Sequence, residues 1–426
     1  MYFLDESPAK DCVFSNVTLI DGTGADPVSN ANIWIKDGMI SEITTSEEKR
    51  NAWLAMNPDL EVIHGEGMYL LPGLMNSHIH VHGYANTDPT VVKLWHLTTH
   101  PTMKFFHAVK NLALLLEAGF TAVRHCGIMT YDLDNCVRDA IKAELFPGPR
   151  VLTCGHDISM TAGHGDLFTP PWATPLSGPT ADGVDECVKA VRTRLRQGAD
   201  FIKIHASGGV MSEGDPIWWR NYSEQEISAI CEEAHAFHRK VSAHAHGTEG
   251  IKVALRGGVD SIEHGSLMDD EGRELMLEKD AYLVPTLATT ASIVKNGLKT
   301  GAPPASIEKG SFMYKKAQEN LKKAYRMGIK IANGSDCFNL LRVRYNRQEF
   351  DELFELEIPP LEIIKMATHN AADLLGILDE TGTIEVGKTA DIIMLCDNPL
   401  KDISALGSRE KTKLVMRYGK IMINKL

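Results

Sequence analysis

Two histidines at the end of an apolar segment are the first residues in the sequence that could do chemistry. The segment runs Leu70-Leu-Pro-Gly-Leu-Met-Asn-Ser-His78-Ile-His80. On a β-strand, side chains spaced i, i+2 point to the same face. Two imidazoles on one strand can therefore bind the same cation, and imidazole suits a borderline metal such as zinc. An isolated His-x-His pair can equally be two surface histidines, so the metal interpretation depends on further ligands.

Further side chains of metal-binding type stand at the ends of later strand candidates. His244 and His246 end one of them, share a face, and need not both be ligands. His264 is the expected ligand from the next strand, and its neighbour Glu263 is expected to point the other way. Asp336 ends the last strand and adds a carboxylate at the same level. Each signal alone is weak, but their joint occurrence at successive strand ends predicts one shared metal site.

A lysine in an apolar strand is the most informative single residue. Lys203 lies in Phe201-Ile-Lys-Ile-His, where an unpaired ammonium would be costly. Such a lysine is expected to be paired, neutral or chemically modified. A neutral lysine amine can react with carbon dioxide to give a carbamate, whose two oxygens can bridge two metal ions. The alternative is a lysine that reaches the rim of the fold, beyond the end of its strand, and pairs there with an acid.

The elements that must position these residues alternate between strand and helix. The clearest helix begins at Ser223, where Glu226 completes a capping box. Strict alternation over eight strands predicts an α/β fold, a (β/α)8 TIM barrel, with its active site at the C-terminal ends of the strands. Residues 287–310 are predicted to be an irregular lid or rim segment. The strand candidates are 74–80, 120–124, 150–154, 200–205, 240–244, 259–264, 281–286 and 329–336.

Both ends of the chain are predicted to be rich in β-structure. Strand and hairpin signals fill residues 12–64, with a turn at Asp37-Gly38, and they recur after residue 383. We expect these segments to pair in a small accessory domain, with the barrel as a self-contained unit between them. The expected division is an accessory β-sandwich from residues 1–68 and 378–426, and a barrel from residues 69–377.

The composition is that of an ordinary globular protein. The 426 residues are 43% hydrophobic and 23% charged, and the net charge of -12 gives no electrostatic footprint for nucleic acid or an anionic membrane. The eight cysteines form no C-x-x-C pair and are expected to be reduced thiols. We find neither a signal peptide nor a transmembrane stretch, so we expect a cytoplasmic protein that acts on a small molecule.

The ordered set of candidate ligands resembles that of the amidohydrolase superfamily, which are metal-dependent hydrolases built on a distorted (β/α)8 barrel. The resemblance covers nearly the whole chain, including the Gly382-Thr-Ile-Glu-Val-Gly-Lys-Thr-Ala-Asp stretch of the accessory domain. The segments that begin at Ser159 and Ala206 resemble the branch with prolidase-like dipeptidases, arginine-type carboxypeptidases and ochratoxin-cleaving amidases, also called imidazolonepropionase-like. The chain departs from the family pattern at Arg124, which is followed by His125 where many relatives have an acid.

The resemblance implies two divalent metal ions, with zinc as the first choice and manganese or cobalt as alternatives. Such a pair, about 3.5–4 Å apart, lowers the pKa of a bridging water. The resemblance also implies that Asp336 accepts the proton of that water and passes it to the departing amine. His164 and His246 are candidates for contact with the substrate. The implied ligands are His78, His80 and Asp336 for one ion and His244 and His264 for the other, with carboxylated Lys203 as the bridge.

The expected function is hydrolysis of an amide bond in a dipeptide or an N-acyl amino acid by metal-activated hydroxide, as in prolidases and carboxypeptidases. One alternative is hydrolysis of a cyclic amide or of another xenobiotic amide or carbamate. Deamination is a weaker alternative, because deaminases as a class lack the bridging lysine that Lys203 supplies. A non-catalytic scaffold is disfavoured by the complete ligand set. We expect a homo-oligomer, since symmetric assemblies are common among such enzymes.

Overall fold

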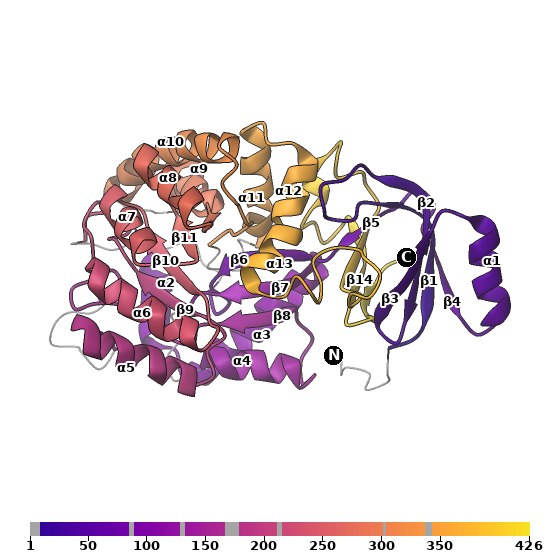
Figure 1. Ribbon diagram of the computed structural model, residues 1–426, viewed down its shortest axis with the longest axis horizontal. Coiled ribbons are helices and arrows are strands. Elements are labelled where there is room, and N and C mark those ends of the chain that lie inside the picture. The colour runs from indigo at the N-terminus through magenta and orange to yellow at the C-terminus, as the bar shows by residue number, and fades with distance from the viewer. Residues whose placement is uncertain are drawn as a thin grey trace.

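The residues that the structure describes form three β-sheets, and Figure 1 shows helices packed around two of them. The structure is a computed structural model that describes residues 9–84, 89–127, 133–166, 179–210, 215–300, 304–336 and 343–426. Residues 1–8, which belong to the predicted accessory domain, lie outside these ranges. Strands from both ends of the chain gather on one side of the molecule, and the alternating strands and helices fill the other side (Figure 1).

The largest sheet has eight strands and draws on both ends of the chain. Its order is β15-β14-β13-β5-β1-β2-β3, with β4 paired to β1. The hairpin predicted at Asp37-Gly38 is confirmed, because both residues have positive φ (51° and 77°), as a type I′ turn requires. The strands are β1 (Cys12–Leu19), β2 (Val28–Lys36), β3 (Met39–Thr44), β4 (Glu61–His64), β5 (Tyr69–Pro72), β13 (Ile392–Leu395), β14 (Thr412–Arg417) and β15 (Lys420–Asn424).

The other two sheets are parallel and hold the strands that precede the site residues. One contains β6 (Leu74–Ile79), β7 (Phe120–His125) and β8 (Arg150–Thr153). The other contains β9 (Ile202–His205), β10 (Val241–Ala245), β11 (Ser261–His264) and β12 (Tyr282–Val284). Single parallel bridges join Ile158 to Ile204 and Leu283 to Ile331. With helices between its strands, this part of the chain has the TIM-barrel-like α/β fold that the sequence predicts.

Helices follow most of the parallel strands and lie outside them (Figure 1). The capping box predicted at Ser223 and Glu226 is confirmed, with each side chain bonded to the backbone of the other residue. The helices are α1 (Glu47–Met56), α2 (Pro89–Thr98), α3 (Pro101–Glu117), α4 (Leu133–Lys142), α5 (Gly183–Arg196), α6 (Glu224–Ala236), α7 (Thr248–Arg256), α8 (Asp270–Glu278), α9 (Leu287–Thr300), α10 (Pro304–Arg326), α11 (Val343–Glu355), α12 (Pro360–Met366), α13 (His369–Leu375) and the 3-10 helix η3 (Ile403–Ala405).

Two local predictions were wrong. Residues 287–310 are not irregular, because they contain α9 and the first turns of α10, which begins at Pro304, a favoured first helical residue. Residues 301–303 lie outside the described ranges. The segment 329–336 is not a regular strand and makes a single bridge, at Ile331. The Asn333 side chain donates a hydrogen bond to the Met75 carbonyl at 2.8 Å, and such side-chain bonds compete with a strand ladder.

The segment after Ile331 nevertheless lies beside β6. The Ser77 amide donates to the Asn333 carbonyl at 2.8 Å, and the Asp336 amide donates to the His78 carbonyl at 2.9 Å. These two backbone bonds bring Asp336 next to the histidines of β6, although 258 residues separate His78 from Asp336 in the chain. The fold thus places the last candidate ligand against the first.

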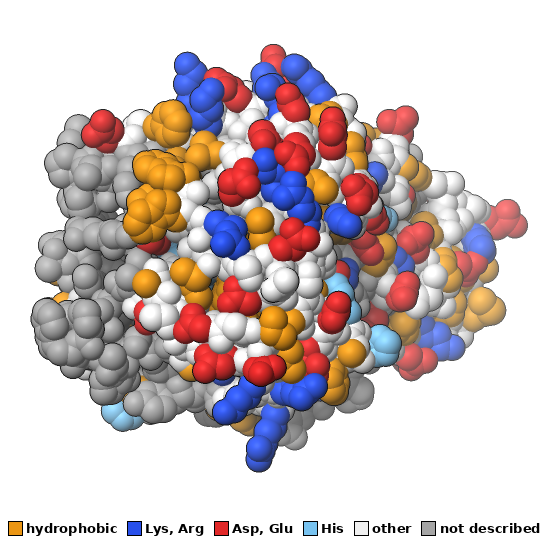
Figure 2. All heavy atoms as spheres, turned by 60° about the vertical axis from the view of Figure 1, so that its left-hand side comes forward, with side chains coloured by type: hydrophobic (Ala, Val, Ile, Leu, Met, Phe, Trp, Pro, Cys, Tyr) orange, Lys and Arg blue, Asp and Glu red, His pale blue; other side chains and the backbone are white. Residues whose placement is uncertain are grey.

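On the face drawn in Figure 2, acidic and basic side chains are interspersed. This distribution agrees with the net charge of -12 and offers no broad basic surface on that face. Within the described parts of the chain, no helix combines the length and the apolar character that crossing a membrane demands.

Candidate metal centre

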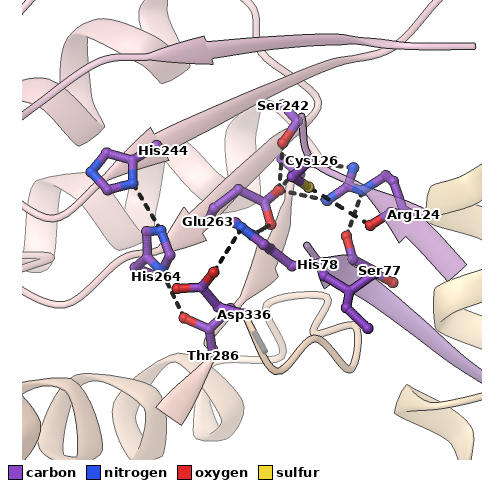
Figure 3. Close-up of polar contacts among 12 residues, drawn as sticks. Ser77, His78, Arg124, Cys126, Ser242, His244, Glu263, His264, Thr286 and Asp336 are labelled. Carbon is purple, nitrogen blue, oxygen red and sulfur yellow. Dashed lines mark hydrogen bonds and ion pairs between the residues drawn. The ribbon is translucent and has the colours of Figure 1, made fainter. Parts of the chain in front are cut away.

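The six candidate metal ligands converge on one buried site. They extend from the C-terminal ends of β6, β9, β10 and β11 and from the segment after Ile331, at the end of the strands where TIM-barrel active sites lie. None of the six is more than 9% exposed. Figure 3 shows four of them, His78, His244, His264 and Asp336, drawn toward one another.

The first part of the site consists of His78, His80 and Asp336. Nε2 of His78 lies 3.5 Å from Asp336 Oδ1, and Nε2 of His80 lies 3.3 Å from the same oxygen. The opposite nitrogen of each ring is held in place: His78 Nδ1 is 2.7 Å from Glu263 Oε2, and His80 Nδ1 is 3.1 Å from the Gly127 carbonyl. The two Nε2 atoms are therefore the ones that face the carboxylate.

These three side chains fit a divalent metal ion. When a ring donates its Nδ1 proton to the oxygen that faces it, Nε2 of the neutral form of that ring carries a lone pair. Asp336 Oδ1 is buried, and no hydrogen bond to it occurs within the described residues. Two nitrogen lone pairs and a carboxylate oxygen within 3.5 Å would repel one another without a cation between them. Histidine and carboxylate are common zinc ligands, so this donor set suits such an ion.

The second part of the site consists of His244 and His264. His244 Nδ1 lies 2.9 Å from His264 Nε2, and the two rings are nearly perpendicular, at 73°. The outer nitrogens are engaged elsewhere: His264 Nδ1 is 2.6 Å from Thr286 Oγ1, and His244 Nε2 is 3.4 Å from the Gly208 carbonyl. A metal ion must lie in the plane of each imidazole that binds it, and two perpendicular rings can meet that condition together.

Two further histidines stack on this pair. His246 is stacked on His264 at 16° with ring centroids 4.5 Å apart, and His164 is stacked on His244 at 13° and 4.3 Å. Stacked rings lie in different parallel planes, so one ion cannot lie in both planes. The geometry therefore favours His244 over His246 as the partner of His264. It leaves His164 and His246 beside the ligands, at positions where they could contact a substrate.

Lys203 acts electrostatically on ligands of both parts of the site. It extends from β9, is 3% exposed, and its side chain makes no hydrogen bond or ion pair with any residue that the structure describes. Burial lowers the pKa of His78 to about 4, and the nearby charge of Lys203 acts in the same direction. Burial also lowers the pKa of His264, with a further contribution from Lys203. The amine of Lys203 is thus close to ligands from both parts.

Asp336 remains a carboxylate in this environment. Burial by itself raises the pKa of Asp336, but the neighbouring His80, His78 and Lys203 outweigh it and bring the pKa below its usual value. The backbone of Asp336 has a positive φ of 50°. An ionised carboxylate held in an unusual backbone conformation is typical of a functional position.

Glu263 does not point away from the site, so that prediction was wrong. Its carboxylate is completely buried beneath His78 and lies 2.6 Å from the Arg124 guanidinium. Burial raises the pKa of Glu263, yet Arg124 and His78 hold the pKa well below its ordinary value. The alternation of strand side chains fails here because His264 has a positive φ of 74°, which lets two successive residues reach the interior.

The departure from the family pattern at His125 has a local explanation. Arg124 pairs with Glu263, whereas His125 Nε2 lies 2.7 Å from Asp134 Oδ1 and His125 Nδ1 lies 3.1 Å from the Ile79 carbonyl. Both ring nitrogens of His125 therefore face acceptors, as in a protonated imidazole. Burial lowers the pKa of His125, but Asp134 outweighs it and raises the pKa above its ordinary value.

Sequence reasoning missed His205. This residue follows Lys203 by two positions on β9, the same spacing as His78 and His80, and that spacing was the signal that could have found it. His205 Nε2 lies 2.5 Å from Asp157 Oδ2, and its ring centroid lies 5.3 Å from that of His244. Burial is the main cause that lowers the pKa of His205 to about 4.

The two predicted substrate contacts each have a polar neighbour at Nδ1. His164 Nδ1 lies 2.7 Å from Asp215 Oδ2, and the same Asp215 oxygen accepts a hydrogen bond from the Gly209 amide at 2.9 Å. His246 Nδ1 lies 2.9 Å from Ser266 Oγ. These bonds fix the orientation of both rings, as a residue that contacts a substrate requires.

Comparison with known proteins agrees with this site. A model of the amidohydrolase family matches residues 69–422. The ochratoxinase of Aspergillus niger is 32% identical over 439 residues, which cover 97% of this chain and 87% of that protein. A crystal structure of a Xaa-Pro dipeptidase with bound methionine in its active site superposes with a TM-score of 0.86 at 30% identity, covering 97% of this chain and 100% of the other. A prolidase complexed with N-methylphosphonate-L-proline gives a TM-score of 0.87 at 31% identity, with the same coverage. The chain belongs to the amidohydrolase family, whose members depend on metal ions, and it is a hydrolase that acts on C–N bonds.

Proposed function

We propose that this protein is a binuclear metal-dependent hydrolase of amide bonds in small substrates, namely dipeptides or N-acyl amino acids. The observation that carries the proposal is the convergence of histidine and carboxylate side chains in one buried place. His78, His80 and Asp336 face one another across 3.3–3.5 Å, next to the perpendicular pair His244 and His264. The relatives named ochratoxinase, Xaa-Pro dipeptidase and prolidase support this substrate class.

The proposal includes the architecture that carries the site. We infer that β6–β12 and the segment at Ile331 form one distorted (β/α)8 barrel within residues 69–377. Two contacts support this inference. The bridge Ile158–Ile204 joins the segment after β8 to β9, and the bridge Leu283–Ile331 joins β12 to the segment whose backbone hydrogen bonds reach β6. Residues 1–68 and 378–426 then form the accessory β-sandwich, and β5 (Tyr69–Pro72), at the start of the proposed barrel range, pairs with β13 as a further strand of the same sheet.

Lys203 supplies the bridge in this proposal. In its unprotonated form, the amine adds to carbon dioxide to form a carbamate and releases one proton. The product is an anion with two oxygens, which would let this side chain hold both ions and so join the His78–His80–Asp336 part to the His244–His264 part. Burial without a partner supports this modification, because a carbamate bound to two cations removes the cost of an isolated buried ammonium.

The chemistry then follows from the positions of the side chains. A pair of divalent ions, which we propose to be zinc, would lower the pKa of a water and polarise the scissile carbonyl when bound. Asp336 begins as a carboxylate, since its pKa lies below the usual value. It accepts the proton of the attacking water and delivers it to the departing amine.

His164 and His246 contact the substrate in this proposal. Ser266 holds Nδ1 of His246, so Nε2 is the nitrogen that reaches toward the site. Asp215 holds Nδ1 of His164 in the same way. Because each ring is stacked on a proposed ligand, a substrate bound at the ions lies within reach of both.

The experiment is a screen of the purified protein against dipeptides, N-acyl amino acids and lactams, before and after treatment with a chelator. We expect hydrolysis of at least one of the first two classes, its loss when metal is removed, and its return when zinc is added. Turnover that persists unchanged after complete metal removal contradicts the proposal. Exclusive cleavage of lactams contradicts the substrate class.

A further inference from the structure

We propose that Thr286 is a positioning residue, and that the short segment Thr286–Thr289 holds the two parts of the metal centre at a fixed separation. This inference rests on the proposed function, because it assigns a role toward the ions that the site would bind. Thr286 follows β12, and α9 begins at the next residue. Neither Thr286 nor Thr289 has the chemistry of a preferred ligand for zinc.

The segment contacts both parts of the site through its two threonine hydroxyls. At one end, Thr286 Oγ1 lies 2.6 Å from His264 Nδ1 (Figure 3). At the other end, Thr289 Oγ1 donates to the carbonyl of Asp336 at 2.6 Å and to that of Ser335 at 2.9 Å. Thr289, three residues after Thr286, therefore contacts Asp336, a proposed ligand of the other ion. A displacement of this segment would move both parts together.

The contact between Thr286 and His264 determines which ring nitrogen faces the ion. Because Nδ1 of His264 is engaged by the threonine hydroxyl, Nε2 is the nitrogen that faces His244. A hydrogen bond of this kind to the outer nitrogen orients a metal-binding histidine and increases its basicity. The hydroxyl, rather than the methyl group of Thr286, carries this role.

The backbone of the site is strained where the segment touches it. His264, Thr286 and Asp336 have φ values of 74°, 50° and 50°. Left-handed backbone is uncommon for residues other than glycine, and for a β-branched residue such as threonine it is an outlier. Such conformations persist only where the surroundings over-determine them, and they cluster at functional sites. Two of them, His264 and Thr286, are in direct contact, and Thr289 of the same segment contacts the third, Asp336.

A buried carboxyl group anchors the segment from a separate helix. The amides of Leu287 and Ala288 donate to the two oxygens of Glu349 at 3.0 Å and 2.7 Å. Glu349 lies on α11 and has no exposed surface. Glu349 of α11 therefore caps the first turn of α9. This cap fixes the start of the helix, where Thr286 and Thr289 lie.

The test compares Thr286→Val, which removes the hydroxyl and keeps the shape, with Thr286→Ser, which keeps the hydroxyl. Metal content is titrated against a competing chelator, and the Co²⁺-loaded proteins are compared by their visible spectra. We expect Thr286→Val to bind one of the two ions about 10–100-fold more weakly and to show a changed spectrum. We expect Thr286→Ser to behave as the parent protein does. Thr193→Val removes a similar hydroxyl bond on the exposed face of α5 and is the matched control.

The outcomes separate this inference from the proposed function. If the parent protein binds no metal, the proposed function fails. If the parent binds two ions and Thr286→Val binds both with unchanged affinity and spectrum, only the positioning role fails. If Thr286→Val and Thr286→Ser lose metal affinity equally, the effect is due to packing, and the positioning role of the hydroxyl is also contradicted. Should Thr286→Val not fold, Glu349→Gln provides the second variant, because it weakens the anchor without touching either histidine. If Glu349→Gln then binds metal with unchanged affinity, the positioning role of this segment is contradicted.

Discussion

The carboxylate of Glu263 lies 2.7 Å from Nδ1 of His78. This contact fixes His78 so that its Nε2 faces Asp336, 3.5 Å away. The other carboxylate oxygen of Glu263 pairs with Arg124, and the hydroxyls of Ser242 and Ser261 each donate to it at 2.7 Å. A residue that binds no ion in the proposal thus controls the orientation of one that does.

Replacing this carboxylate is expected to weaken metal binding. In Glu263→Gln the amide keeps the size of the side chain but loses the charge that faces His78 and Arg124. We expect metal affinity to fall about 10–100-fold, as for other residues that support a ligand. Equilibrium dialysis against a metal buffer measures the change, with the exposed Glu278→Gln as the control. Parental affinity in Glu263→Gln would show that the contact does not serve the metal.

Lys203→Ala tests the bridge between the two parts of the site. We expect this variant to lose hydrolysis and to retain less metal, because alanine has no amine that can form a carbamate. Metal analysis and turnover of the refolded, metal-supplemented protein measure both effects. A short carboxylic acid added to the variant is expected to restore part of the activity by taking the place of the carbamate. Near-normal turnover in Lys203→Ala would count against the bridging role.

Asp336→Asn tests the proton transfer. The amide keeps the volume of the side chain but cannot accept the proton of the attacking water, so turnover should fall by orders of magnitude. The circular dichroism spectrum and melting midpoint should stay close to those of the parent. A folded variant that remains fully active would refute the assignment of Asp336 as the proton acceptor.

The stacked rings lead to a separate prediction for His246. Because His246 and His264 lie in parallel planes, we expect His246→Asn to keep both metal ions. The same variant should lose catalytic efficiency through a higher KM, a lower kcat or both, since the substrate contact is gone. Metal analysis measures the ion content of the variant, and steady-state kinetics measure its KM and kcat. A variant that loses one equivalent of metal would identify His246 as a ligand.

Glu349 provides a prediction about pH and stability. Burial raises its pKa from the ordinary 4.5 to about 8, although two backbone amides act in the opposite direction. The folded protein therefore holds this proton more tightly than the unfolded chain does. The resulting stability is fully present below pH about 4.5 and is lost as the pH rises to about 8.

Glu349→Gln should remove that part of the pH dependence. Between pH about 4.5 and about 8, the parent should lose stability as the pH rises, whereas the variant should not. The free energy of unfolding of the variant minus that of the parent should therefore increase by a few kcal/mol across this window, at about 1.4 kcal/mol per pKa unit. Urea unfolding at both ends of the window measures the difference. Parallel stability curves for the two proteins would contradict the burial of an ionisable Glu349.

The sequence predicts much of this site because strand ends and turns have local signatures. The positive φ values at Asp37 and Gly38 follow from residue types that favour a tight hairpin. The i, i+2 histidines and Lys203 stand out because a charged or metal-binding side chain is unexpected in an apolar strand. These features depend on residues that are close together in the chain.

Other features depend on contacts that no local pattern encodes. The prediction for Glu263 failed because the backbone of His264 is left-handed, and the long-range bond to Thr286 helps to hold it there. The irregular path after Ile331 likewise follows from side-chain bonds to β6, such as that of Asn333. The role of Glu349 at the start of α9 is set by the packing of two helices far apart in sequence.

Anomalous diffraction from crystals of the zinc-loaded protein tests the central claim most directly. We predict two peaks about 3.5–4 Å apart, one beside His78, His80 and Asp336 and one beside His244 and His264. Electron density should continue beyond Nζ of Lys203 and contact both peaks. A Lys203 side chain that ends in a free amine, with fewer than two peaks among these residues, would contradict the account.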